Sequence, residues 1–198
     1  QSVAATVRRL VWRVDEERPV IPPGKALHWR AMALAKEAIE LGGRLTVVSA
    51  FTGLPRFLLN NLFGDPDAPG TIPGRKPRSA HWYLNRTVVV EIQSAFFYAC
   101  FRSIRTFGYP PSDALVASYK HYLRHFGHDP RLTFDRAFDL VGHVEGLWTN
   151  APPRLTTTIC RRCRAAYLVL CTDESIGSRG CPFCRFERPL SGQTRKAL

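Results

Sequence analysis

Apolar residues recur every three or four positions in a segment that follows a proline-containing stretch. They are Leu27, Ala31, Leu34, Ala38 and Leu41. This spacing places them on one face of a helix, so we predict an α-helix over residues 25–41 that ends at Gly42 and Gly43. The preceding residues 1–24 contain prolines that interrupt any long element, and we expect them to form an N-terminal arm.

Two shorter apolar segments follow, over residues 44–51 and 55–63, with a Thr-Gly-Leu sequence between them. Their apolar positions are Leu45, Val48, Leu54, Leu58 and Leu62. Pro55 suits the first turn of the second helix, because the amide hydrogen that proline lacks has no partner there. Two short helices joined by a glycine-containing turn are typical of a helix-turn-helix, which we therefore predict for residues 44–63.

The sequence from residue 64 to residue 150 predicts a loop followed by longer helices. Residues 64–79 are rich in proline and glycine and predict a loop, whereas residues 80–107 contain neither and predict one long helix. Ser112 and Thr133 can each cap a further helix, because apolar and aromatic residues recur at helical spacing after both. The fold class is therefore mainly α, with a helical domain over residues 25–150.

Four of the six cysteines form two pairs with the same internal spacing, Cys160-Arg-Arg-Cys163 and Cys181-Pro-Phe-Cys184. Two residues between thiolates allow a tight turn to hold both sulfurs about 2.3 Å from a metal ion, and a second turn completes a tetrahedron. The separation of the pairs is within the range typical of four-thiolate zinc sites. Apolar residues 165–171 between them predict a strand, so we expect a small four-cysteine module resembling a zinc ribbon, and a basic tail, over residues 151–198.

Two other roles for these cysteines are open from the sequence. They could form two disulfides, which are typical of secreted proteins, or redox-active dithiol pairs. If they bind Zn²⁺, four thiolates leave no position for water, so one structural ion per chain is expected. Cys100 and Cys171 are expected to be buried apolar residues rather than ligands.

The charge balance indicates a polyanionic partner. The chain has 28 Lys and Arg against 16 Asp and Glu, a formal net charge of +12. Nucleic acid is the expected partner, with an anionic membrane surface as the second possibility. No stretch approaches the roughly 20 apolar residues that span a bilayer, and no signal-like segment opens the sequence, so we expect a cytoplasmic protein without a membrane partner.

Arginine and asparagine side chains supply candidate contacts to double-stranded DNA. Arginine can bind guanine, and asparagine adenine, through paired hydrogen bonds in the major groove, while isolated basic residues suit phosphates. The candidates are Arg44, Arg56, Asn60 and Asn61 in the helix-turn-helix segment, Arg75, Lys76 and Arg78 in the predicted loop, and Arg161 and Arg162 between the first two cysteines.

Enzymatic chemistry is not indicated. The sequence contains no phosphate-binding glycine loop, no G-x-S-x-G nucleophile motif and no compact acidic cluster, so we expect no catalytic residues. A zinc-ribbon RNA-binding or ribosome-associated module would show the same charge and cysteines, and it is the alternative to a DNA-binding protein.

Several short segments, in this order along the chain, resemble the FlhC family of flagellar master regulators. They are Ile39-Glu-Leu-Gly-Gly-Arg44-Leu, Thr52-Gly-Leu, Trp82-Tyr83, Tyr119 to Tyr122, Phe134-Asp-Arg-Ala137 and the two cysteine pairs. The resemblance covers roughly residues 31–186. The segment after Thr52-Gly-Leu and the N-terminal arm differ from the family pattern.

The resemblance implies a transcriptional activator subunit that works in a heteromeric complex with an FlhD-like protein. Such a complex binds promoter DNA and contacts RNA polymerase. The target genes implied are flagellar, or those of conjugative transfer, because FlhC-like proteins on mobile elements also activate transfer.

Overall fold

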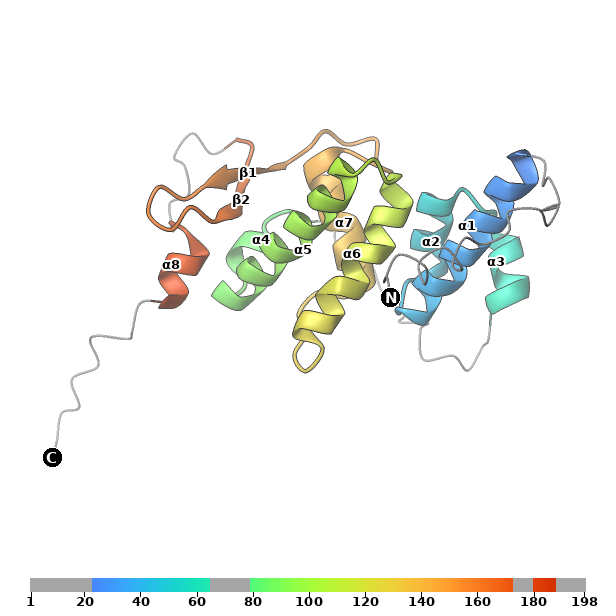
Figure 1. Cartoon of the computed structure of the whole chain (residues 1–198), viewed down its shortest axis with the longest axis horizontal. Coiled ribbons are helices and arrows are strands. Elements are labelled where there is room, and N and C mark those ends of the chain that lie inside the picture. The colour runs from blue at the N-terminus through green and yellow to red at the C-terminus, as the bar shows by residue number, and fades with distance from the viewer. Residues whose placement is uncertain (1–22, 65–78, 173–179, 188–198) are drawn as a thin grey trace, which may run out of the picture.

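The computed structural model describes residues 23–64, 79–172 and 180–187 (Figure 1). The described helices and strands, in chain order, are α1 (Pro23–Glu40), α2 (Leu45–Thr52), α3 (Arg56–Phe63), α4 (Trp82–Asn85), α5 (Val88–Thr106), α6 (Pro111–Phe126), α7 (Phe134–Glu145), β1 (Leu155–Ile159), β2 (Ala166–Leu170) and α8 (Pro182–Glu187). The mainly helical fold and its small cysteine-containing C-terminal region are confirmed. Within these described ranges, no helix is both long and apolar enough to cross a bilayer.

The elements follow one another along an elongated molecule (Figure 1). Helices α1, α2 and α3 lie at one end, α5, α6 and α7 form the centre, and the β1–β2 hairpin and α8 lie at the other end. The main buried core draws on every helix from α1 to α7. Ser94 of α5 and Ser118 of α6 are completely buried, and such small side chains allow these two helices to pack closely.

The turn after α1 requires both of its glycines. Gly42 has a φ of 84°, in the left-handed region where other residues are strained. A Cβ on Gly43 would lie 2.7 Å from the carbonyl oxygen of Ala38 and 2.9 Å from the ring of Phe134. The end of α1 therefore approaches the start of α7 more closely than any side chain at position 43 permits.

The two short helices predicted for residues 44–63 are confirmed as α2 and α3. Gly53 ends α2 in the left-handed conformation, with a φ of 73°, and its amide donates to the carbonyl of Ser49. Pro55 lies at the N-cap of α3, one position before the first turn where we predicted it.

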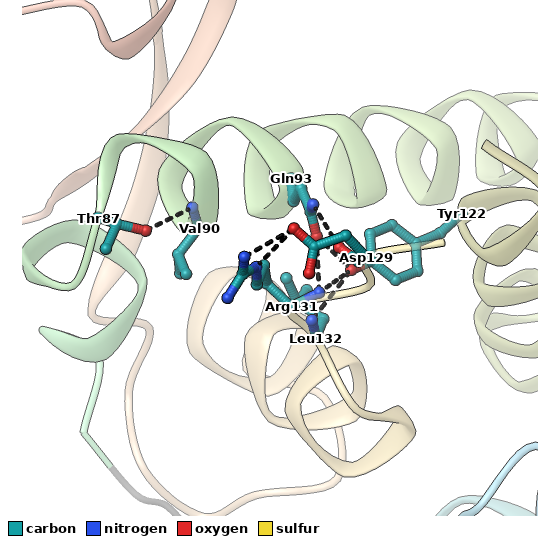
Figure 2. Close-up of polar contacts among 7 residues, drawn as sticks. All are labelled: Thr87, Val90, Gln93, Tyr122, Asp129, Arg131 and Leu132. Atoms are coloured by element: carbon teal, nitrogen blue, oxygen red, sulfur yellow. Dashed lines mark hydrogen bonds and ion pairs between the residues drawn. The ribbon is translucent and has the colours of Figure 1, made fainter. Parts of the chain in front are cut away.

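The single helix predicted over residues 80–107 is wrong, because the chain breaks between α4 and α5. Thr87 is extended there, and its hydroxyl accepts a hydrogen bond from the amide of Val90 at 3.3 Å (Figure 2). Threonine is a favoured N-cap residue, so this local hydrogen bond begins a new helix although no proline or glycine marks the break.

The predicted caps of the two following helices differ in outcome. Thr133 caps α7 as predicted, since its hydroxyl accepts from the amide of Arg136. Ser112 caps nothing: α6 begins at Pro111, and the Ser112 hydroxyl donates to the carbonyl of Phe51 at 2.8 Å. Proline has a fixed φ suited to the first helical turn, so it starts α6 without a side-chain cap.

A buried polar network fixes the loop between α6 and α7 onto α5 (Figure 2). The Tyr122 hydroxyl donates to the side-chain oxygen of Gln93 and accepts from the amides of Arg131 and Leu132, at 2.8 and 2.9 Å. The Gln93 amide group donates to the carbonyl of Asp129 at 3.0 Å. Both side chains are buried, and these hydrogen bonds replace the water that burial removes.

Candidate metal centre

The first cysteine pair lies in the turn of the β1–β2 hairpin. The strands are antiparallel, and Ile159 pairs with Ala166 at their ends, so the connecting turn holds Cys160 and Cys163. Arg164 adopts a left-handed φ of 64°, which allows the turn to close. Strand β2 confirms the strand predicted over residues 165–171, whereas β1 was not predicted.

The second cysteine pair begins a short helix rather than occupying the second tight turn that we predicted. Cys181 immediately precedes Pro182, the first residue of α8, and Cys184 follows within the first turn of this helix. Proline is well suited to a first helical position. The amide of Arg185 donates to the carbonyl of Cys181 at 3.1 Å, which closes the turn and points both sulfurs toward the hairpin.

The four sulfurs form a cluster with metal-site dimensions. The Sγ atoms of Cys160 and Cys184 lie 3.8 Å apart, those of Cys163 and Cys181 lie 3.6 Å apart, and all four are within 4.8 Å of one another. A tetrahedron with metal–sulfur bonds of about 2.3 Å has edges of about 3.8 Å. The cluster therefore fits one metal ion with four thiolate ligands.

Local hydrogen bonds prepare this cluster for a cation. The amides of Cys163 and Arg162 face the sulfur of Cys160 and lower the pKa of its thiol to about 6, which favours the thiolate. The pKa of Cys184 is raised, mainly by the neighbouring sulfur of Cys163, and burial raises that of Cys181. The Cys160 thiol therefore loses its proton more readily than the thiols of Cys181 and Cys184.

The metal module, which we define as β1, β2, the 160–165 turn and α8, packs against α5. Ala95 of α5 lies in a small buried cluster with Tyr167, Cys160 and Cys181. The guanidinium of Arg185 forms an ion pair with the carboxylate of Glu91, which is only 10% exposed. The cysteine cluster and α8 are therefore anchored to the helical part of the chain by both apolar and ionic contacts.

The two cysteines outside the cluster are less buried than we predicted. Cys171 is exposed and Cys100 is partly buried. Cys171 follows the last residue of β2, where the strand leaves the sheet, so its apolar neighbours in sequence do not cover it.

The structure places the predicted DNA contacts in different settings. Arg161 and Arg162 are exposed on the turn that carries Cys160 and Cys163, and Arg56, Asn60 and Asn61 are exposed on α3. Arg75, Lys76 and Arg78 lie outside the described residues. The predicted contacts therefore do not converge on one surface, since α3 and the metal module lie at opposite ends of the molecule (Figure 1).

Arg44 makes a contact within the protein. Its Nε lies 3.0 Å from the carboxylate of Asp135, and its backbone amide donates to the same carboxylate at 3.1 Å. Asp135 is buried in the first turn of α7. Any DNA contact by Arg44 would compete with this ion pair.

Sequence reasoning missed the contacts that join the metal module to α5. Glu91 lies in an otherwise apolar stretch and Arg185 directly follows a ligand cysteine. A lone acid in an apolar helix segment is a signal that a partner is needed, because an unpaired buried charge is unstable. The sequence does not reveal which of the many arginines is that partner.

Two kinds of comparison with known proteins, with family models and with individual proteins, indicate the same family. The model of the family described as "Flagellar transcriptional activator (FlhC)" matches residues 26–197. A flagellar transcriptional regulator FlhC from Paraburkholderia atlantica is 29% identical over 175 residues, covering 86% of this chain and 76% of that protein. The protein of the same name from Sodalis glossinidius is 30% identical over 144 residues, covering 70% and 69%. One from Proteus mirabilis is 29% identical over 140 residues, covering 68% of each chain. The chain therefore belongs to the FlhC family of flagellar transcriptional activators.

Proposed function

We propose that this chain is a DNA-binding subunit of a cytoplasmic transcriptional activator, and that it works in a complex with an FlhD-like protein. The complex binds promoters of flagellar genes, or of conjugative-transfer genes, and contacts RNA polymerase there. Membership of a family of transcriptional activators supports the regulatory role, and the net charge of +12 supports binding to a polyanion.

The observation that carries DNA binding is the position of Arg161 and Arg162. Both are exposed, and both lie between two cysteines of the cluster, so a bound metal would fix the backbone that presents them. A fixed turn loses less conformational freedom when its arginines bind phosphate. The loop residues Arg75, Lys76 and Arg78 are proposed as further phosphate contacts, on the basis of sequence alone.

Zn²⁺ is the proposed metal. Thiolates favour soft or borderline ions, and four thiolates at tetrahedral spacing are typical of structural zinc. When bound, the ion would supply no reaction. It would hold the hairpin turn and α8 together, and thereby position the arginines of the turn.

The proposed base-reading residues are Arg56, Asn60 and Asn61 of α3. They are exposed on the second helix of the helix-turn-helix segment, but so are Phe57 and Leu62, at 68% and 52%. Exposed apolar residues suit a protein partner instead. Asn60→Ala should weaken binding to the preferred site by about 1–3 kcal/mol and to random DNA much less, if α3 reads bases. Impaired complex assembly with an unaltered specificity ratio would assign α3 to the FlhD-like partner.

Binding of the complex to a duplex promoter fragment and to structured RNA of equal length tests the proposal. The chain is co-expressed with an FlhD-like protein, and the mass of the purified complex is measured first. At moderate salt we expect clear preference for the duplex. Equal or tighter binding to RNA would contradict the proposal and favour an RNA-binding or ribosome-associated module.

A further inference from the structure

A groove lies between α5 and the β1–β2 hairpin, and its lining includes Ala95 and Tyr167, which also pack with Cys160 and Cys181. Its floor on the α5 side is one helical stripe that includes Tyr98, Ala99, Arg102, Ser103 and Thr106. The hairpin side is formed by residues of both strands. We call this the α5–hairpin groove. Its cavity is about 270 Å³ and is lined mainly by apolar atoms.

The size and lining of the groove fit protein side chains. Small-molecule sites usually occupy about 300–1,000 Å³, so the cavity is small for a cofactor but large enough for an apolar side chain. Ile159, on the hairpin rim, is 65% exposed. Phe107, which directly follows Thr106 in the chain, and Tyr109 are 78% and 54% exposed. Large exposed apolar and aromatic side chains are typical of protein interfaces.

The charge around the α5–hairpin groove is mainly positive. Arg102 lines it and is exposed, and Arg105 is exposed one turn further along α5. The chain contains no Asp or Glu over residues 92–112 or 146–172, which supply both walls. One carboxylate from α7 does reach the groove, because Glu145 accepts a hydrogen bond from the Tyr98 hydroxyl at 2.5 Å.

We propose that the α5–hairpin groove binds a short acidic peptide segment of a partner protein. An apolar side chain of the segment fills the cavity, and its carboxylates lie beside Arg102 and Arg105. Arginine and aromatic residues dominate the binding energy of many protein interfaces, and both types rim this groove. Duplex DNA fits less well, because its sugar–phosphate surface has no side chain to fill an apolar cavity. This proposal goes beyond the DNA-binding function and does not depend on it.

Selection from a phage-displayed random 12-residue peptide library tests the proposal, with the metal-loaded full-length chain as the target. We expect enrichment of peptides that combine acidic residues with an apolar anchor. Fluorescence anisotropy with the most enriched peptide should show binding weakened about tenfold or more by Ser103→Trp, which fills the groove, and by Arg102→Glu. Matched changes on exposed positions of α6, Ala117→Trp and Arg124→Glu, should leave binding unchanged.

Metal content and circular dichroism establish that each variant is folded, and Thr106→Trp replaces Ser103→Trp if the latter misfolds. The proposal is overturned if no acidic peptide is enriched, or if the groove variants bind the enriched peptide as tightly as the wild type does.

Binding to a random-sequence DNA duplex is measured in parallel. Weakened duplex binding by the groove variants, with peptide binding intact, would assign the groove to DNA instead. Loss of all duplex binding by the wild type would contradict the proposed function and leave the groove assignment standing.

Discussion

The helical body, α1 to α7, and the metal module differ in what stabilises them. The body has a continuous buried core to which each of its helices contributes. The module's own buried cluster contains Ala95, Cys160, Tyr167 and Cys181, of which one residue belongs to α5 and two are proposed ligands. Burial of one large apolar side chain contributes about 1.5–3 kcal/mol, whereas metal binding in small zinc peptides contributes about 10–16 kcal/mol.

This difference determines how each region responds to damage. The stability of the body is distributed over many side chains, so one substitution removes a fraction of it. The proposed metal site depends on four sulfurs acting together, so one substitution should remove most of the stability of the module. The hairpin is an intermediate case, because Leu155 at its base and Leu168 in the middle of β2 belong to the core of the body. Metal loss should therefore release the 160–165 turn and α8 while the hairpin base stays packed.

The largest expected effect is loss of the metal from Cys163→Ser. The wild type should contain about one equivalent of zinc. The variant should contain close to none, because the three remaining thiolates do not complete the tetrahedral set of ligands. Elemental analysis of the purified protein measures this. Cys171→Ser is the matched control, since this exposed cysteine lies outside the cluster. Full metal retention by Cys163→Ser, or equal loss from both variants, would refute the ligand assignment.

The next effect is at the junction between the two regions. Arg185→Met removes one charged partner of the buried Glu91 carboxylate, while Glu91→Gln leaves an arginine that is 30% exposed and can be hydrated. Removing one partner of a fully buried ion pair lowers the free energy of unfolding by about 3–5 kcal/mol. Solvent access at Arg185 should make the loss smaller here. Chemical denaturation should therefore show Arg185→Met to be the more destabilised of the two. The reverse order would mean that the ion pair does not join the regions.

A smaller effect is expected in the body from Tyr122→Phe. Loss of the hydroxyl leaves the amide of Leu132 without its hydrogen bond, at a cost of about 1–3 kcal/mol. The side-chain oxygen of Gln93 loses one of its two donors and keeps the amide of Arg131, at 2.8 Å. Tyr109→Phe, at an exposed position, should change the free energy of unfolding little. Both variants should keep their metal, and metal loss from Tyr122→Phe would show that the two regions do not fold independently.

The smallest effect concerns the arginines that the module presents. Arg161→Ala and Arg162→Ala should each lower the slope of log binding constant against log salt by about one unit on any DNA sequence. The exposed Arg124 of α6 provides a matched alanine control. Unchanged slopes for both arginines, measured by fluorescence anisotropy over a salt series, would place the DNA on another surface.

The sequence predicted most helices and the metal cluster because their signals are local. Helical spacing depends on neighbouring residues, and each cysteine pair forms within one turn. The break before α5 was missed because a threonine cap is a weak signal inside a run without proline or glycine. Strand β1 was missed because three consecutive threonines give it no apolar alternation, and its pairing with β2 supplies the stability.

The motifs that indicated the family are largely structural. Gly43 lies against Phe134, Arg44 pairs with Asp135, and the guanidinium of Arg136 lies 4.0 Å from the centre of the Trp82 ring. Three segments distant in sequence therefore meet at the start of α7. Gly43 was interpreted as a helix end and Arg44 as a DNA contact, because pairings between distant segments are not visible in one sequence.

Hydrogen exchange of backbone amides, with and without a chelator, tests the central claim most directly. With metal bound, amides of the 160–165 turn and α8 should be protected. After chelation they should exchange rapidly, while α6 and α7 keep their protection, because local opening reports local stability. Unchanged protection in α8, or an equal loss across α6 and α7, would contradict the account of a metal-dependent module on a self-sufficient helical body.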